Sequence, residues 1–141
     1  MNSTASEPSL PRRFVLYVPI EQPEGLALCE VIQLVLCERL GGVTSYPAHG
    51  IFRMADGRRT SEPVQVLEAY CEALEWADEH PFLIALAQVV GAILQQESIA
   101  CAIDGRMEMI TPPARQIGET AAIGASQSEK ALTDLVLRQL T

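Results

Sequence analysis

The sequence has few positive charges, and almost none of them come from lysine. It carries 10 lysine and arginine residues against 18 aspartate and glutamate residues, for a formal net charge of −8, and Lys130 is its only lysine. Proteins bind the phosphate backbone of nucleic acids mainly by neutralising it with lysine and arginine. We therefore expect no general binding to DNA or RNA. The excess of acid favours solubility, or contact with a basic partner surface.

Long apolar runs and targeting patterns are also missing. A membrane-spanning helix needs roughly 20 consecutive apolar residues, whereas the longest apolar run here, residues 82–94, is interrupted by Gln88. Residues 1–11 are polar and lack the basic and then apolar order of a secretory signal. The expected location is the cytoplasm, without membrane association.

The cysteines form no paired motif. Cys29, Cys37, Cys71 and Cys101 include no C-x-x-C spacing, whereas zinc sites usually show closely spaced ligand pairs. Free cysteine behaves as a small buried hydrophobic residue. We therefore expect the cysteines to lie in the core, and we expect neither a metal nor a cofactor.

The apolar pattern predicts one α+β domain. Strands are predicted at 13–20, 43–55, 62–71 and 98–110, and helices at 26–40 and 78–96. The pairs Asp56-Gly57 and Asp104-Gly105 are typical of hairpin turns, the second leading to a short fifth strand or to a kink. This order of elements predicts a ferredoxin-like β-α-β-β-α-β sandwich with an antiparallel sheet.

Several details follow within this order. Gly50 predicts a bulge or kink in the second strand, and Asp78 is the expected N-cap of the second helix, with Pro81 at an early helical position. That helix is apolar almost all round, so it is either covered on two sides or lies at a subunit interface.

The chain divides into a flexible arm at 1–11, the ferredoxin-like domain at 12–111, and a linker with an amphipathic tail helix at 112–141. The tail helix, at 128–140, is too short to be stable alone in water. We expect it to dock on its own domain or on another chain through the apolar residues Leu132, Leu135, Val136 and Leu140.

A series of short motifs resembles a family of small bacterial proteins of unknown function. That family's pattern runs G-L-T, G-x-W, a D-G turn, E-x-S and Q-E-S-V. The matching segments here are Gly42-Val43-Thr44, Gly50-Ile51-Phe52, Asp56-Gly57, Glu62-Pro63-Val64 and Gln96-Glu97-Ser98-Ile99. Phe52 replaces the family's Trp, and Val64 replaces its Ser. The resemblance spans about residues 14–110 and implies the ferredoxin-like fold, but no mechanism.

No catalytic motif is present, whether G-x-S-x-G or a glycine-rich phosphate loop. The polar candidates are His49 and Glu97 for catalysis, and Arg53, Glu62, Gln96 and Tyr46 for ligand binding. A histidine with its ordinary pKa of about 6.5 can act as a general base. Arg53 and Glu62 flank a predicted hairpin, where they either form a cross-strand ion pair or anchor an anionic or amide ligand.

Three functions fit these observations. The favoured one is a non-enzymatic binding or regulatory protein that forms a homodimer and acts on a protein partner. The first alternative is a small cofactor-independent enzyme of the oxygenase or isomerase type, with a pocket between sheet and helices. Its polar groups would be His49, Arg53, Glu62 and Glu97. The second alternative is a structural subunit of a larger assembly, held by the tail helix.

Overall fold

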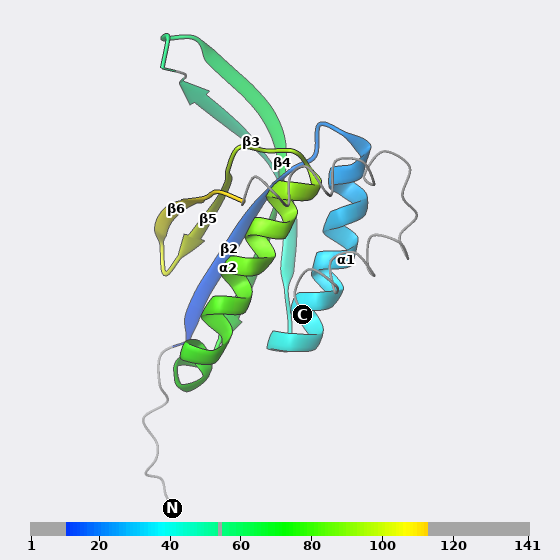
Figure 1. Ribbon diagram of the computed structural model, residues 1–141. Coiled ribbons are helices and arrows are strands. Elements are labelled where there is room, and N and C mark those ends of the chain that lie inside the picture. Colours follow the sequence, from blue (N-terminus) through cyan, green and yellow to red (C-terminus); the bar gives the residue numbers. More distant parts are fainter. Residues whose placement is uncertain (1–10, 54, 113–141) are drawn as a thin grey trace, which may run out of the picture.

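A five-stranded antiparallel sheet carries two helices on one face (Figure 1). This is seen in a computed structural model, which describes residues 11–53 and 55–112. The elements run in the order β2 (Arg12–Pro19), α1 (Pro23–Leu40), β3 (Thr44–Arg53), β4 (Arg59–Cys71), a 3₁₀ helix η1 (Ala73–Glu75), α2 (Trp76–Ile93), β5 (Ile99–Ile103) and β6 (Arg106–Ile110). The predicted α+β class and antiparallel sheet are confirmed.

The predictions for the two ends of the chain fall largely outside the described residues. They concern the arm, most of the linker and the tail helix with its expected interface of Leu132, Leu135, Val136 and Leu140. None of the helices in the described ranges is long and apolar enough to cross a lipid bilayer.

Strand β2 lies at the centre of the sheet, whose order is β3-β4-β2-β5-β6. It pairs antiparallel with β4 on one side and with β5 on the other. Hairpins join β3 to β4 and β5 to β6. The second hairpin turns at Asp104 and Gly105, whose φ angles are 52° and 83°. The second Asp-Gly pair therefore leads to a fifth strand and not to a kink.

The main core lies between the sheet and both helices. Alternate residues of β2 point into it, and Phe14, Leu16 and Val18 are fully buried there. The helices contribute residues such as Leu28 from α1 and Leu86 from α2. Because burying a large aliphatic or aromatic side chain stabilises a fold by about 1.5–3 kcal/mol, this layer fixes which face of the sheet the helices cover.

The other face of the sheet carries a smaller apolar cluster. Val15, Val64, Val66 and Ala102 form it, with the half-buried Tyr17 packed against them. In the strand register Val15 lies opposite Ala102, and Tyr17 lies opposite Val66. Successive side chains of a strand point to opposite faces, so these residues lie on the side away from α1 and α2. We call this side the open face.

Two local predictions from the sequence are wrong. The β3–β4 register runs without interruption through Gly50, which pairs with Glu62, so Gly50 makes no bulge. Helix α2 begins at Trp76 with Glu75 as its N-cap, which places Asp78 in the first turn and Pro81 inside the helix. The helix starts two residues earlier than predicted, and Trp76 packs against the main core, which stabilises this earlier start.

The start of α1 packs directly on the end of β2. A Cβ atom placed on Gly25 would lie 2.2 Å from the carbonyl oxygen of Pro19 and 3.0 Å from the Cα of Ile20. Both are backbone atoms, which cannot move aside as a flexible side chain can. The close approach holds the start of α1 against the end of β2 at which Pro19 lies.

We predict that Gly25→Ala lowers the free energy of unfolding by about 1–3 kcal/mol, the usual cost of overpacking. Gly42→Ala is the matched control, because a Cβ there has nothing within 4 Å, and it should change stability by less than about 0.5 kcal/mol. Urea unfolding followed by circular dichroism measures both. Equal effects of the two substitutions would contradict the packing described here.

Candidate functional site

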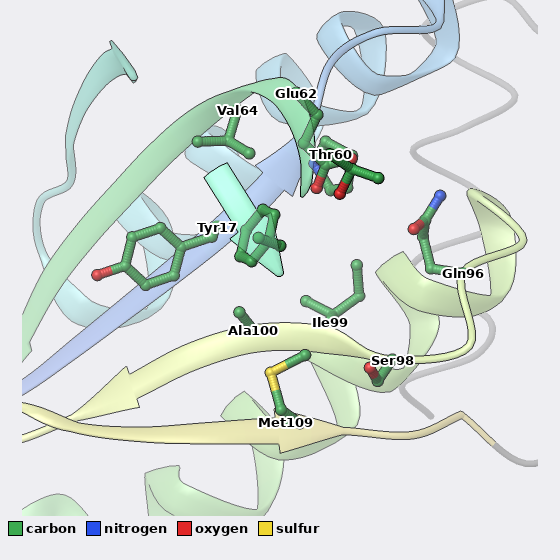
Figure 2. Close-up of a pocket in the computed structure, with 11 residues that line it drawn as sticks. Tyr17, Thr60, Glu62, Val64, Gln96, Ser98, Ile99, Ala100 and Met109 are labelled. Carbon is green, nitrogen blue, oxygen red and sulfur yellow. The ribbon is translucent and has the colours of Figure 1, made fainter. Parts of the chain in front are cut away.

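A cavity of about 240 Å³ opens on the open face, where β2 ends and α2 leads into β5 (Figure 2). Strands β2, β3, β4, β5 and β6 and the α2–β5 connection all contribute to it. Its lining consists of Tyr17, Pro19, Phe52, Thr60, Glu62, Val64, Gln96, Ser98, Ile99, Ala100 and Met109. The wall is mostly apolar, and no lysine or arginine is among the described residues that form it.

Glu62 and Gln96 are the two large polar side chains of this pocket. Among the described residues Glu62 has no hydrogen-bond or ion-pair partner, and burial, followed by repulsion from the nearby Glu21, raises its pKa. The Gln96 amide group donates a hydrogen bond to the Leu94 carbonyl oxygen at 3.3 Å. Its own side-chain oxygen accepts none from the part of the chain described, so both residues keep acceptors available for a ligand.

Aromatic and sulfur-containing side chains supply the apolar wall. Tyr17 reaches the pocket from β2, Phe52 from β3 and Met109 from β6. A Cβ on Gly50 would lie 2.6 Å from an edge carbon of the Phe52 ring. The missing side chain at Gly50 therefore leaves room for the Phe52 ring to lie back over its own strand, which is the structural role of this glycine.

A second polar group on the open face is centred on Glu68. Its carboxylate accepts two hydrogen bonds from the Arg13 guanidinium, at 3.1 and 3.0 Å, one from the Tyr70 hydroxyl at 3.1 Å and a longer one from the Tyr46 hydroxyl at 3.5 Å. The Arg13 hydrogen bonds are the main reason that the pKa of Glu68 is lowered. We call these four residues the Glu68 cluster.

A larger hollow of about 420 Å³ lies at the other end of the sheet. It is bounded by Arg12, Trp76, His80 and the β5–β6 turn. The Arg12 guanidinium lies 4.7 Å from the Trp76 ring centroid and forms an ion pair with Asp104. Arg12 is thus engaged with both Trp76 and Asp104, and it links the start of α2 to the β5–β6 turn.

The structure brings together only some of the residues predicted from sequence. Glu62 and Gln96 both line the pocket, and Tyr46 belongs to the Glu68 cluster. Arg53 pairs in register with Arg59, and Glu62 pairs with Gly50. The predicted cross-strand pair of Arg53 and Glu62 is therefore wrong, because the hairpin register sets these residues three positions apart.

The two candidate catalytic residues lie away from the pocket. The exposed His49 contacts the Ser61 hydroxyl through Nε2, and the alternation of β3 places it on the face opposite to Gly50 and Phe52. Glu97 is exposed and does not line the pocket. Sequence reasoning missed Tyr17, Phe52 and Met109 as pocket residues, and it did not bring Arg13 and Glu68 together.

The described cysteines offer no reactive or metal-binding set. Cys29, Cys71 and Cys101 are buried as expected, whereas Cys37 is exposed, which corrects its predicted core position. Burial raises the pKa of the Cys29 thiol to about 12 and that of Cys101 to about 11. Within the described ranges no three histidine, cysteine, aspartate or glutamate side chains are grouped as metal ligands would be.

Known proteins resemble this chain in fold and not in sequence. Neither the family models nor the curated proteins compared with the sequence match it. The fold is similar to that of a phage SAM lyase in complex with S-methyl-5′-thioadenosine, with 12% identity over 77% of this chain and 96% of that one, at a TM-score of 0.51. A phage SAM lyase in its apo state is 14% identical over 79% and 95% of the two chains, at a TM-score of 0.49.

These comparisons correct the favoured prediction from sequence. At 12% identity the likeness to the complexed lyase shows a similar fold. The expectation of a non-enzymatic interaction protein rested on the absence of a recognisable catalytic set. It is overturned by the complexed lyase, a protein of similar fold that is an enzyme, and the enzyme alternative is the better supported one.

The raised pKa of Glu62 predicts that this residue affects the stability of the protein in a pH-dependent way. Because its folded-state pKa is raised, the folded protein holds this proton more tightly than the unfolded chain, whose glutamates titrate near a pKa of about 4.3. The ionised carboxylate therefore opposes folding at neutral pH, and this penalty disappears below the unfolded pKa. We predict that Glu62→Gln raises the melting temperature at pH 7 and leaves it nearly unchanged at pH 3.

The matched control is Glu97→Gln, which changes an exposed glutamate outside the pocket. It should leave the melting temperature nearly unchanged at both pH values. Differential scanning calorimetry of the three proteins measures the effect. A lower melting temperature of Glu62→Gln at pH 7 would show that the ionised Glu62 is stabilised by its surroundings and would contradict this description of the pocket.

Proposed function

We propose that this protein is a small lyase that binds S-adenosylmethionine (SAM) on the open face of its sheet and releases S-methyl-5′-thioadenosine. The observation that carries the proposal is the pocket itself, in which the described residues combine two aromatic rings with a carboxylate that none of them pairs, and include no cationic side chain. The similar fold of a SAM lyase that binds S-methyl-5′-thioadenosine supports it.

A sulfonium ligand suits this lining better than a phosphorylated one. The sulfur of SAM carries a permanent positive charge surrounded by carbon, and aromatic faces attract such cations. Tyr17 provides a ring, and the ionised Glu62 provides a negative charge to the same pocket. A phosphate group would need arginine or lysine for recognition, and neither occurs in the lining formed by residues 11–53 and 55–112.

The remaining pocket groups match an adenosine. Glutamine can pair with an adenine edge by accepting from N6 and donating to N7. The side-chain oxygen of Gln96 accepts no hydrogen bond from the described residues, so it suits the first of these bonds. A carboxylate accepts hydrogen bonds from ribose hydroxyls in many nucleotide sites. We assign adenine to Gln96 and the Phe52 ring, the ribose to Glu62, and the sulfonium to Tyr17.

The proposed reaction breaks the bond between sulfur and the four-carbon amino-acid chain. Both bonding electrons pass to sulfur, so that the neutral thioether leaves as S-methyl-5′-thioadenosine. The amino-acid fragment balances its charge by bonding its own carboxylate oxygen to the carbon that sulfur leaves, or by losing a proton from the neighbouring carbon. Because the leaving group is already activated, the protein contributes mainly by binding and orienting the substrate.

This proposal changes the reaction class and the place of the enzyme predicted from sequence. That enzyme was of the oxygenase or isomerase type, with its pocket between sheet and helices, whereas the cavity lies on the open face.

We also propose that the fold is ferredoxin-like, with β6 as an added edge strand, and the strand order β3-β4-β2-β5 supports this. Homo-oligomer formation stays a prediction.

The direct test is to incubate the purified protein with SAM and to follow products by liquid chromatography and mass spectrometry. We expect S-methyl-5′-thioadenosine and an equal amount of the four-carbon product. Glu62→Gln should lower kcat/KM by about 10- to 100-fold, because a hydrogen bond to a charged group is worth about 1.5–3 kcal/mol.

Glu97→Gln serves as the control and should retain the wild-type rate, since Glu97 lies outside the pocket. The absence of thioadenosine product from the wild-type protein at high enzyme concentration would overturn the proposed function. Equal loss of activity in Glu62→Gln and Glu97→Gln would contradict the assignment of the active site to this pocket.

A further inference from the structure

The pocket is too small to enclose the whole of the proposed substrate. Sites for small molecules usually have volumes of about 300–1,000 Å³, and this cavity has about 240 Å³. If the adenosine part fills it, the amino-acid part must lie outside, along the sheet surface. The following inference therefore rests on the proposed function and concerns where that second part binds.

Strand β2 connects the pocket to the Glu68 cluster along the open face. Tyr17 lines the pocket and Arg13 belongs to the cluster, and both residues lie on the same face of the strand. Four residues of a strand span about 13 Å, and the Arg13 side chain shortens the gap because its guanidinium reaches Glu68, which pairs with Val15, the residue midway between Arg13 and Tyr17. The surface between them is the apolar cluster around Val15, Val66 and Ala102.

Arg13 is the one basic residue on the open face among the described strands. The strand register places Arg12, Arg53, Arg59 and Arg106 on the other face. The apolar pocket and this single cation therefore lie at two ends of one surface. A ligand with an apolar cationic part and a distant carboxylate would match both ends.

The hydrogen bonds of Glu68 hold the Arg13 guanidinium in one orientation. Glu68 accepts from Nε and from one terminal nitrogen, Nη2. The guanidinium group has five N–H donors in a rigid fork, so its outer edge, between Nη1 and Nη2, keeps donors for a second carboxylate. The Arg13 side chain is 40% exposed, against 16% for Glu68, which leaves the arginine accessible while its partner is largely covered.

We propose that Arg13 binds the α-carboxylate of the amino-acid end of SAM. Glu68 is a positioning residue, because its carboxylate already receives four hydrogen-bond donors. The exposed rings of Tyr46 and Tyr70 border this second subsite. The arrangement distinguishes substrate from product, since S-methyl-5′-thioadenosine has no carboxylate for Arg13 to hold and is released more readily.

The test compares two ligands that differ at this end. S-adenosylhomocysteine keeps the amino-acid carboxylate but lacks the sulfonium charge and is not cleaved, whereas S-methyl-5′-thioadenosine lacks the amino-acid part. Isothermal titration calorimetry gives the Kd of each. We expect Arg13→Gln to weaken S-adenosylhomocysteine binding by about 10- to 100-fold, the range for a charge-assisted bidentate contact, and to change thioadenosine binding by less than about twofold.

Arg12→Gln is the matched control, because it removes the same charge from the neighbouring residue on the other face of β2, where Arg12 pairs with Asp104. It should leave both Kd values unchanged. Arg13→Lys keeps a charge and the packing of the aliphatic stem but loses the planar fork. It should weaken the binding of S-adenosylhomocysteine, but not that of S-methyl-5′-thioadenosine, and by less than Arg13→Gln does. It also allows the comparison if Arg13→Gln fails to fold.

The possible outcomes separate this inference from the function on which it rests. If the wild-type protein cleaves SAM and Arg13→Lys leaves the affinity for S-adenosylhomocysteine unchanged, the carboxylate subsite is overturned and the lyase function stands. Equal weakening of both ligands by either Arg13 variant would show a structural role for Arg13 and also overturn the subsite. If the wild-type protein binds neither ligand, the proposed function falls, and the inference falls with it.

Discussion

The packing of both helices on one face of the sheet determines where every other feature of this molecule can lie. Phe14, Leu16 and Val18 of β2 are fully buried in that layer, and strand geometry then turns Arg13, Val15 and Tyr17 to the opposite side. Residues on the open face do not pack into the main core, so they need not be apolar. This is the face on which the pocket and the Glu68 cluster form, with a continuous apolar surface between them.

Two glutamates on the open face of β4, six residues apart, have different surroundings and therefore different properties. Glu68 has a full set of donors, and its pKa is lowered. Glu62 is partly buried beside Glu21 with no donor among the described residues, and its pKa is raised. A carboxylate left unpaired beside aromatic rings costs stability and suits a cationic ligand, whereas a saturated carboxylate can only orient its arginine. Ligand binding and positioning are thus divided between the two residues in our account.

The local parts of the fold could be predicted from sequence, and the non-local parts could not. Alternating apolar residues located β2 to within one residue, and the two Asp-Gly pairs marked both hairpins. Glu62 and Gln96 were found as polar residues beside strands. Arg13 and Glu68 are 55 positions apart, so their contact needs the β2–β4 register. The placement of the Phe52 ring over Gly50 could not be predicted from the sequence either. Under the proposed function a search for nucleophiles would also mislead, because cleavage of a sulfonium needs binding groups more than it needs an activated base.

The central claim is that the open face binds the adenosine part of a sulfonium substrate at Glu62 and Gln96. A crystal structure of the protein soaked with S-methyl-5′-thioadenosine tests it most directly. The account predicts the purine against Phe52 with its edge on the Gln96 amide, and the ribose hydroxyls on Glu62. Thioadenosine bound between the sheet and the helices, or in the hollow beside Trp76, would contradict the account, as would an open face that stays empty at saturating ligand.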